Sequence, residues 1–581
     1  MPDLTLSSHT FQTFDGTTLV YRAWRPATSA RRALVLFHRG HEHGGRWTEL
    51  VPELAPEGFA VFAWDARGNG RSEGPRDDAE SFSVYAKDAD AFVRHLSATE
   101  GIAIEDMAIV GHSVGAAVAA AWVHDFAPRV RALVLATPAF RIRLYVPFAI
   151  PGLRLAQALG LMKIVPSYVK ARVLTHDPEA RRRHEGDTLI THSISTRVLL
   201  DLYDTATRLI ADAGALRVPL LVLTAGSDWV VQSSAAERFF ERAGSTVKRL
   251  QRLPGFFHDV YHEADRAVPL EATRAFIEEA FATPAAPETQ IGADRCGYTF
   301  DEHRALLDAP PAWSPIGLYY LVLAALMNTI GRLSDGVRLG YTSGFNSGRT
   351  LDYVYENRPR GRMLVGRLID RAYLGSIGWQ GIRVRRRQLE GLLGKAIRHA
   401  QQAQPRVHVV DIAGGAGRYV LEAVQAAKPA PVTALVRDFE PKNLDEGRAR
   451  ARALGIGHVS FEQGDAFDAA SLAALQPRPQ VAIVSGLYEL FPSNEMVLRS
   501  LRGLAAAMPE GAYLVYTNQP WHPQLALIAR TLCDWDGKPW VMRRRTQAEM
   551  DDLVREAGFV KEEMDLDRWG IFTVSLARRA A

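Results

Sequence analysis

The sequence predicts two α/β domains, each built on a mostly parallel β-sheet with helices on both faces. Two series of short apolar runs alternate with longer segments of helical periodicity, one series in each half of the chain. A stretch rich in proline and alanine, residues 283–294, separates the two series. Parallel sheets that are buried on both faces produce this alternation. A chain of 581 residues is also too long for a single hydrophobic core.

The composition is that of an ordinary globular protein. Apolar residues make up 47% and charged residues 23%, which excludes disordered and collagen-like classes. Only two cysteines occur, far apart, so neither a disulfide framework nor a cysteine-based zinc site is expected. A formal charge of +4 is too small to indicate nucleic-acid binding. Residues 1–16 lack the charged and apolar regions of a secretion signal, so we expect a cytoplasmic protein.

The first domain is expected to span residues 1–282. Its strands are predicted at residues 19–24, 33–37, 60–65, 107–113, 132–138, 219–228 and 246–255. The alternation lapses between about residues 138 and 217, where helical patterns and two prolines interrupt an apolar stretch. We interpret this insertion as a lid, which either packs on the core or lines an acyl channel. Its Arg-Arg-Arg-His run at 181–184 favours a solvated helix face over a lipid-binding patch.

The second half divides into a linker at 283–294, a helical segment at 295–400 and an α/β domain at 401–581. Within the helical segment, the apolar run 316–327 is shorter than the roughly 20 residues of a spanning helix. It indicates either a buried helix, which we favour, or a helix lying on a membrane surface. The strands of the last domain are predicted at residues 407–415, 432–438, 459–465, 480–486, 513–518 and 570–579.

A serine between a strand and a helix is the first candidate for chemistry. Residues 111–115 read Gly-His-Ser-Val-Gly and join the strand MAIV to the helix AAVAAAWVHDF. The glycines allow the strand and the helix to approach, and the tight turn exposes the hydroxyl of Ser113. A serine needs a base, and the base needs an orienting acid. Asp228 and His258 each follow a strand, in the order Ser, Asp, His that this fold class uses, and His262 is the competing base.

Residues 37–47, FHRGHEHGGRW, contain three histidines, which raises the possibility of a metal site. Together with the serine turn, the stretch DARGNGRS at 65–72 and the sequence GFFHDVYHE around His258, this loop resembles the monoacylglycerol lipase and lysophospholipase branch of the α/β-hydrolases, of the serine aminopeptidase S33 type. The resemblance covers residues 10–282. It implies that the loop supplies backbone N–H groups to an oxyanion and that no metal is bound.

The resemblance assigns those amide donors to Gly40 and Val114. The sequence departs from the family at Arg39 and His41, where glycine is expected. An amide donor survives a change of side chain, so activity is still expected, and the two substitutions bear on the shape of the loop and on its substrate preference. Two interpretations fit Arg39: it meets an anionic group of the substrate, or it points to solvent.

The second candidate site follows the first strand of the last domain. Residues 407–420 read VHVVDIAGGAGRYV, an apolar strand, an acid, a loop of small residues and a helix. A dinucleotide-binding site would have the motif G-x-G-x-x-G and would bind a pyrophosphate at the N-terminus of the helix. Here Asp411 precedes the glycines, which suits a cationic ligand better.

This loop is similar to motif I of the class I S-adenosylmethionine-dependent methyltransferases, with Ala413 in place of the first glycine. The resemblance implies a Rossmann-like fold that binds S-adenosyl-L-methionine. Asp438, at the end of the second strand, would bind the ribose hydroxyls, and Asp465 is similar to the adenine-contacting acid after the third. The residues implied for the cofactor site are Asp411, Gly414, Gly415, Gly417, Asp438, Asp465, Ala466 and Ser485.

The methyl acceptor is less defined. Tyr488, Glu489, Asn518 and His522 lie where acceptor contacts usually arise, and Glu489 or His522 would be a base or a pocket wall. Arginines cluster at 383–387 and 543–545. Helix faces carrying salt bridges explain both clusters, and attraction to anionic lipid headgroups is the alternative.

The order of the parts resembles a bacterial group of fused α/β-hydrolase and class I methyltransferase proteins. It implies a bifunctional enzyme that hydrolyses a monoacylglycerol or lysophospholipid-like ester and methylates a lipid-related or small-molecule acceptor. We expect small-molecule or lipid partners, peripheral contact with the inner membrane surface and no nucleic acid. One alternative is that one half is catalytically silent and binds a membrane or a partner. Another is a nucleic-acid methyltransferase that acquired a hydrolase, which a steep salt dependence of RNA binding would reveal.

Overall fold

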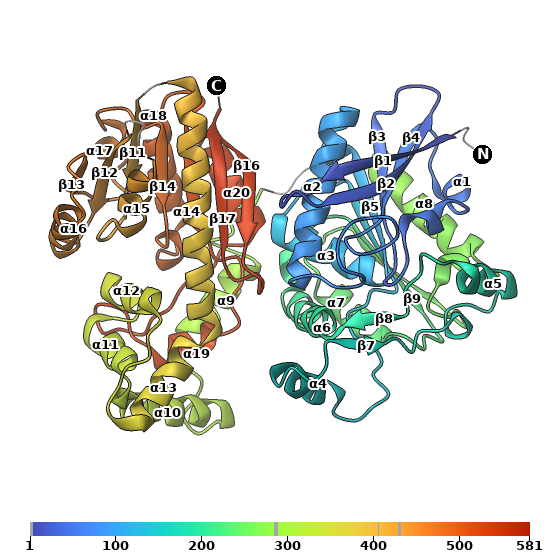
Figure 1. The fold of residues 1–581 in the computed structure, drawn as a ribbon, viewed down its shortest axis with the longest axis horizontal. Coiled ribbons are helices and arrows are strands. Elements are labelled where there is room, and N and C mark those ends of the chain that lie inside the picture. The colour runs from blue at the N-terminus through green and yellow to red at the C-terminus, as the bar shows by residue number, and fades with distance from the viewer. Residues whose placement is uncertain (1–3, 284–288, 405, 428–431, 581) are drawn as a thin grey trace. The chain divides into compact units, whose positions relative to one another are not determined.

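The computed structural model describes residues 4–283, 289–404, 406–427 and 432–580. The chain divides into two compact units, Met1–Glu288 and Thr289–Ala581. The division falls inside the predicted linker 283–294, of which residues 284–288 lie outside the described part of the chain. Each unit contains its own sheet and its own buried apolar clusters (Figure 1).

The first unit contains an eight-stranded sheet in the order β1-β2-β4-β3-β5-β6-β9-β10. The strands β3, β4, β5, β6, β9 and β10 are parallel to one another, whereas β1 and β2 run antiparallel at one edge. Their bounds are β1 Leu4–Gln12, β2 Thr18–Pro26, β3 Arg32–Phe37, β4 Phe59–Trp64, β5 Met107–His112, β6 Ala132–Ala136, β9 Leu220–Ala225 and β10 Lys248–Leu253. The sequence analysis missed β1, because polar residues dominate this edge strand and only one of its positions is fully buried.

Helices cover both faces of this sheet, with α2 packed beside α3 and α1 beside α8. Their bounds are α1 Val51–Leu54, α2 Phe82–Glu100, α3 Val114–Phe126, α7 Ser233–Arg242 and α8 Ala267–Ala282. Between β6 and β9 lies the predicted lid, with α4 Ala149–Ala158, α5 Pro178–Gly186 and α6 Thr196–Ala211. The lid also contains a small antiparallel pair, β7 Ile164–Pro166 with β8 Ser193–Ser195, where only helices were expected.

The lid helix α5 carries the basic run 181–184. Its Arg182 is exposed, as a solvated helix face requires. His184 is buried and its Nδ1 lies 3.3 Å from Glu42 Oε1, so the last residue of the run packs against the loop that follows β3.

The second unit contains a seven-stranded sheet in the order β13-β12-β11-β14-β15-β17-β16, in which only β17 runs antiparallel to its neighbours. The bounds are β11 Val407–Asp411, β12 Val432–Asp438, β13 Val459–Gln463, β14 Val481–Val484, β15 Tyr513–Asn518, β16 Phe559–Leu566 and β17 Thr573–Arg579. The sequence analysis missed β16, another edge strand with an alternating burial pattern. Strand β11 lies between β12 and β14 in the sheet. The chain first continues from β11 to β12 on one side and later returns to β14 on the other side. Ligands bind at such a reversal of strand order.

Helices cover both faces of the second sheet. The long helix α14 runs along one face, and α18 and α20 pack on the other (Figure 1). The bounds are α14 Ile377–Ala403, α15 Arg418–Ala426, α16 Pro441–Ala453, α17 Ala469–Ala473, α18 Asn494–Ala507, α19 Leu525–Thr531 and α20 Gln547–Glu556. Helix α14 continues past the boundary predicted at residue 400, so the helical segment and the α/β domain share an element.

The remaining helices of the segment are α9 Tyr298–Leu307, α10 Pro315–Asn328, η6 Ile330–Leu333, α11 Asp335–Ser343, α12 Gly348–Glu356 and α13 Met363–Leu374. The favoured interpretation of residues 316–327 as a buried helix is wrong. Most of the large apolar side chains of α10 are exposed, because the helix contacts α19 and η6 along one side only. Within the described residues, one helical stretch, Pro315–Leu333, is long and apolar enough to cross a bilayer.

The interpretation of arginines 543–545 as a helix face carrying salt bridges is wrong about the helix, although Arg543 and Arg544 do form ion pairs. All three side chains are buried and lie in an extended stretch before α20. Arg543 donates to Glu549 Oε1 at 2.8 Å, and Arg545 donates to the carbonyl oxygens of Tyr488 and Phe491. Burial lowers the pKa of Arg545 to about 10. The arginines therefore hold the loop after β14 rather than meeting headgroups.

Candidate functional site

Ser113 lies at the tight turn between β5 and α3. Its backbone has φ 55° and ψ −113°, a conformation that is strained for any residue with a side chain. Gly115 makes the turn possible, because a Cβ at this position would lie 2.3 Å from the carbonyl oxygen of His38. The serine side chain consequently projects from the carboxyl edge of the sheet into a pocket.

The structure brings Ser113, His258 and Asp228 together. His258 Nε2 lies 2.8 Å from Ser113 Oγ, and His258 Nδ1 lies 2.9 Å from Asp228 Oδ2. Asp228 follows β9, and its second oxygen accepts hydrogen bonds from two backbone N–H groups at 2.7 and 2.8 Å. Burial alone would raise the pKa of Asp228, but the imidazole and these amides lower it below its usual value. The carboxyl group is therefore an anion that orients the imidazole.

His262, the competing base, does not reach the serine. Its Nδ1 lies 2.9 Å from Asp259 Oδ1 and its Nε2 lies 3.2 Å from the carbonyl oxygen of Arg46. Although burial lowers its pKa, Asp259 raises it to about 9. A protonated, fully engaged imidazole cannot accept a proton at Ser113.

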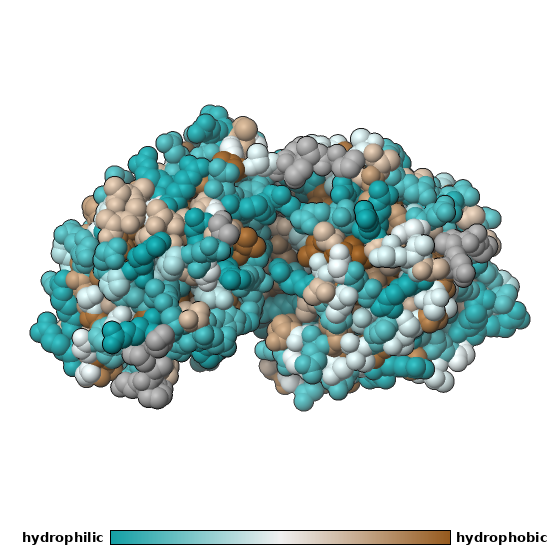
Figure 2. Space-filling view, turned by 90° about the horizontal axis from the view of Figure 1, so that it is seen from above, coloured by the Kyte–Doolittle hydropathy of each residue, from teal (hydrophilic) through white to brown (hydrophobic). Residues whose placement is uncertain are grey.

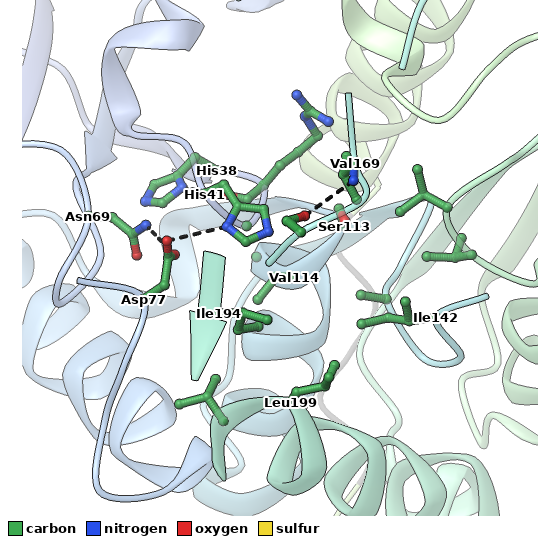
Figure 3. Close-up of a pocket in the computed structure, with 18 of the residues that line it drawn as sticks. His38, His41, Asn69, Asp77, Ser113, Val114, Ile142, Val169, Ile194 and Leu199 are labelled. Carbon is green, nitrogen blue, oxygen red and sulfur yellow. Dashed lines mark hydrogen bonds and ion pairs between the residues drawn. The ribbon is translucent and has the colours of Figure 1, made fainter. Parts of the chain in front are cut away.

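Gly40 and Val114 lie side by side at the mouth of the pocket. A Cβ at Gly40 would approach Val114 Cγ2 to 2.8 Å, so a larger residue at position 40 would press on the Val114 side chain. Both residues line the same cavity as Ser113 and His258. Figure 3 shows Ser113 and Val114 beside this cavity, with Ile142, Ile194 and Leu199 around it.

The three histidines of the loop have separate partners. His38 donates from Nδ1 to the carbonyl oxygen of Arg39 and accepts at Nε2 from Ala66 N–H, which keeps the ring neutral. His41 Nδ1 lies 3.3 Å from Asp77 Oδ2, as Figure 3 shows. His43 Nε2 lies 2.9 Å from Asp187 Oδ2. Among the described residues, no three histidine, cysteine or acidic side chains gather as metal ligands.

His41 occupies a position where the resemblance expects glycine, and the backbone explains that expectation. Its φ of 69° lies in the left-handed region that glycine adopts without strain. The histidine pays about 1 kcal/mol or more for this conformation, which its contacts with Asp77 and Thr191 offset in part.

Arg39 does not point to solvent, and that interpretation is wrong. Its side chain is 4% exposed and pairs with Glu42 and with Asp259, whose Oδ2 lies 3.3 Å away. Asp259 directly follows His258, so Arg39 links the loop after β3 to the loop that carries the imidazole. Burial raises the pKa of Asp259, but Arg39 and His262 lower it well below its usual range. The sequence analysis missed Asp259, because its partner lies 220 positions away.

The lid closes the pocket with aliphatic side chains. Together with the turn at Ser113 they leave a cavity whose walls are mostly apolar. The lid residues in the wall include Ile142, Leu144, Val165, Ile194, Val198 and Leu199. An apolar wall beside a nucleophile suits an extended hydrocarbon chain better than a polar acyl group.

In the second unit the structure brings the predicted loop residues to the carboxyl ends of the central strands. Asp411, at the end of β11, is fully buried and accepts a hydrogen bond from Ala413 N–H at 3.2 Å. Its other oxygen, Oδ2, has no hydrogen-bond partner within the described part of the chain. Burial raises the pKa of this carboxyl to about 7, although the neighbouring Tyr419 hydroxyl acts in the opposite direction. A buried carboxylate with a spare oxygen suits a cationic ligand.

Asp438 ends β12 beside that loop. Its Oδ2 accepts a hydrogen bond from Gly415 N–H at 2.8 Å, and Oδ1 accepts one from Asn443 Nδ2 at 2.9 Å. Gly414 and Gly417 pack against Val436 without a side chain between them. The glycine loop is thereby held against the second strand.

The other predicted cofactor residues also follow strands of this sheet. Asp465, after β13, is exposed and caps Phe467 N–H at 2.8 Å, whereas Ala466 is buried. Ser485 directly follows β14 and is partly exposed. Phe439, which the sequence analysis passed over, follows Asp438 and is 68% exposed. Its position directly after the strand-ending Asp438 was the signal that could have identified Phe439 as a candidate cofactor-site residue.

The four predicted acceptor residues separate into two groups. Tyr488 donates its hydroxyl proton to Ser500, and Asn518 donates to the carbonyl oxygen of Arg545, so both side chains are used inside the core. Glu489 lies 3.3 Å from Arg385 and keeps Oε2 without a partner among the described residues. Burial lowers the pKa of His522 to about 4, so this ring is neutral.

Comparison with known proteins covers both units. Residues 28–265 match a family model described as "Serine aminopeptidase, S33", and residues 273–579 match one described as "Putative methyltransferase". A protein of Escherichia coli strain K12, "Uncharacterized protein YnbC", is 47% identical over 575 residues, with 98% of each chain covered. The chain belongs to this family of hydrolase–methyltransferase fusions. Its first half is an α/β-hydrolase, and its second half is a methyltransferase domain.

Further relatives of the fusion family match the hydrolase half. "Monoacylglycerol lipase" of Mycolicibacterium smegmatis is 28% identical over 48% of this chain and 99% of its own length. "Phospholipase YtpA" of Bacillus subtilis is 26% identical over 45% of this chain and 98% of its own length. The solved monoacylglycerol lipase of Paleococcus ferrophilus is 22% identical, with a TM-score of 0.40, and the match covers 48% of this chain and 99% of that one.

Proposed function

We propose that the fusion protein is a bifunctional enzyme whose first half hydrolyses carboxylic esters through Ser113. The observation that carries this proposal is the hydrogen-bonded line from Ser113 Oγ through His258 to Asp228, at 2.8 and 2.9 Å. A serine becomes nucleophilic when a base at this distance accepts its proton, and an oriented carboxylate stabilises the resulting imidazolium.

The reaction follows from this geometry. Ser113 Oγ attacks the ester carbonyl carbon while His258 Nε2 accepts the hydroxyl proton. Negative charge develops on the carbonyl oxygen, where the N–H groups of Gly40 and Val114 stabilise it. Collapse of this intermediate expels the alcohol, which takes the proton from His258 and leaves the acyl group on Ser113. Water, deprotonated by His258, then releases the acid and restores the serine.

We propose a monoacylglycerol or a lysophospholipid-like ester as the substrate class. The aliphatic wall formed by the lid supports a long acyl chain, and two relatives carry the names of a monoacylglycerol lipase and a phospholipase. A single-chain lipid also leaves its polar end free to face the rim of the pocket.

The test of the hydrolase uses a fluorophosphonate probe on the intact protein. We expect labelling of the wild type that is lost in Ser113→Ala and in His258→Ala, together with loss of monoacylglycerol hydrolysis. The exposed His192 lies outside the site, so His192→Ala is the matched control and retains labelling. Failure of the folded wild-type protein to label would favour the alternative, a silent half that serves as a binding module.

For the second half we propose methyl transfer from S-adenosyl-L-methionine to a lipid-related or small-molecule acceptor. When bound, this cofactor supplies a methyl group on a positively charged sulfur. The spare oxygen of Asp411 fits the ammonium group of the cofactor, which S-adenosylhomocysteine also carries. Asp438 would accept hydrogen bonds from the ribose hydroxyls. Gly415 presents no side chain to the ligand, with open space within 4 Å of a Cβ placed there.

Titration calorimetry with S-adenosylhomocysteine on the intact protein tests this second activity. We expect Asp411→Asn to weaken binding at least about tenfold, since a charged hydrogen bond contributes more than about 1.4 kcal/mol. Asp445→Asn, an exposed acid of α16, is the control and leaves binding unchanged. Binding should also weaken as pH falls below about 7, because the ionised carboxylate is the form that binds. Equal affinities for both variants would contradict the proposed site.

A further inference from the structure

The helical segment of the second unit exposes large apolar side chains on α10, η6 and α13. Both α10 and α13 contact the short η6 element that lies between them in sequence, and Figure 1 shows the two helices at one end of this unit. The exposed set comprises Trp313, Ile316, Leu318, Tyr319, Leu321, Val322, Leu326, Ile330, Met363, Leu364, Val365 and Leu368, with exposed fractions between 47% and 87%. We call this set the α10–α13 surface.

A surface of this kind is unusual for a protein in water. Exposed apolar residues are normal when they are scattered, whereas contiguous patches mark an interaction site. On the face of the molecule drawn in Figure 2, hydrophilic residues predominate and apolar residues occur in small groups. The α10–α13 surface instead places apolar side chains at nearly every turn of two helices.

The segment that carries the α10–α13 surface is rich in arginine. Between residues 309 and 373 the sequence has eight arginines, no lysine and four acidic residues. The acids are engaged: Asp335 pairs with Arg338, Glu356 with Arg360, Asp352 with two arginines of the α/β domain, and Asp370 is buried. Exposed arginines that make no ion pair within the described residues include Arg358, Arg362, Arg367 and Arg371. The rim is therefore positively charged.

The geometry of α10 favours lying in a membrane interface over crossing a membrane. The 14 residues of α10 rise about 21 Å, which is less than the roughly 30 Å of a bilayer core. The longer stretch Pro315–Leu333 includes η6 and a break at Thr329, whose ψ of −88° is not helical. One side of α10 also contacts α19 of the folded unit. A helix held in this way can insert only its free face.

We infer that the α10–α13 surface binds anionic lipid bilayers, with the apolar side chains in the interface and the arginine rim on the headgroups. The apolar face supplies affinity through burial in the acyl boundary, and the arginines supply selectivity for negative charge. This surface belongs to the methyltransferase half, so it would hold that half at a membrane whether or not the lid of the hydrolase half also touches lipid. The inference does not depend on either proposed activity.

Co-sedimentation of the intact protein with vesicles tests this inference. One set of vesicles is phosphatidylcholine alone and the other is an equal mixture of phosphatidylcholine and phosphatidylglycerol. We expect binding to the mixed vesicles and little binding to phosphatidylcholine. Triple substitution of Leu321, Leu364 and Leu368 by serine should lower the partition coefficient at least tenfold. All three residues are more than half exposed, so folding should be unaffected, which the thermal transition checks.

Two further variants separate the contribution of the arginine rim from that of exposed apolar side chains elsewhere in the chain. Replacement of Arg362 and Arg367 by glutamine should reduce binding to the mixed vesicles roughly tenfold or more and flatten its salt dependence. Replacement of Leu161 in the lid and of Val560 on β16 by serine removes exposed apolar side chains elsewhere and should leave the preference for anionic vesicles intact.

The inference is overturned if the wild-type protein does not bind mixed vesicles, or if the leucine triple variant binds as well as the wild type. Size-exclusion chromatography distinguishes the other occupants in that event. A dimer that the triple variant dissociates would assign the surface to a second copy of the chain, and a monomer in both cases would exclude that occupant as well.

Discussion

Asp411 is a buried carboxyl group that destabilises the free protein when it ionises. Its side chain is fully buried, one of its oxygens has no partner in the described part of the chain, and its pKa is raised to about 7. A raised carboxyl pKa means that the folded state binds a proton more tightly than the unfolded state does. The stability of the ligand-free protein therefore falls as pH rises from about 4 to about 7.

The first prediction concerns this residue. Asp411→Asn should raise the melting temperature of the ligand-free methyltransferase half by a few degrees at pH 8, because the buried charge is removed. At pH 5 the folded wild-type carboxyl group is protonated and only the cost of taking up that proton remains, so the two melting temperatures should differ clearly less than at pH 8. Calorimetric scans at both pH values measure the difference. A stabilisation of the same size at both values would show that the carboxyl group is not titrating in this range.

The second prediction concerns Arg39, which sits between two buried carboxylates. Arg39→Met removes the cation that Glu42 and Asp259 share, although His262 still faces Asp259 and Arg46 still faces Glu42. Removing one partner of a buried ion pair costs about 3–5 kcal/mol. The thermal transition of the hydrolase half should fall accordingly. Arg182→Met, an exposed arginine of α5, is the control and should change the free energy of unfolding by less than about 0.5 kcal/mol. Equal effects of the two substitutions would mean that the pair is not formed.

At the scale of the element, the turn between β5 and α3 depends on how closely the helix approaches the end of β3. A Cβ at Gly115 would meet the carbonyl oxygens of His38 and Phe37 at 2.3 and 2.5 Å, and these backbone atoms cannot move independently of the sheet. The first turn of α3 must then shift, and it carries both Ser113 and the Val114 amide.

The third prediction follows from that contact. Gly115→Ala should slow fluorophosphonate labelling of Ser113 about a hundredfold or more, since misplacement of reacting groups by about 1 Å has such an effect. The matched control is Gly152→Ala in the lid helix α4, where no atom lies within 4 Å of the added Cβ. Labelling of Gly115→Ala at the wild-type rate would indicate that the turn accommodates the added methyl group without moving Ser113.

At the scale of the whole molecule, the chain consists of two units with separate sheets and separate apolar clusters. The fourth prediction is that calorimetry of the intact protein resolves two transitions. Leu135→Ala, in β6, should lower only the transition of the hydrolase half, and Leu501→Ala, in α18, only that of the methyltransferase half. Each fully buried leucine contributes about 3–5 kcal/mol. A single transition that both variants lower equally would contradict independent folding.

The limits of prediction from the sequence are clear in particular elements. Strands such as β5 and β9, buried at every position, are visible as apolar runs because both faces of the sheet are covered. The edge strands β1 and β16 were missed because one side of each is open to water and their apolar residues are few. The arginines 543–545 were misjudged because their partners, such as Thr299 and Asn494, are remote in sequence.

The amino-acid sequence was sufficient to predict the two α/β folds, the hydrolase and methyltransferase families, and the residues that the structure brings together around Ser113. These features depend on local order: apolar periodicity, glycine spacing and the order of strands along the chain. The positions of buried charge and of exposed apolar surface emerged from the three-dimensional packing. It buried Arg39 between two carboxylates and left α10 largely exposed, because burial depends on which distant segments pack against a residue and not on the residue's own neighbours in sequence.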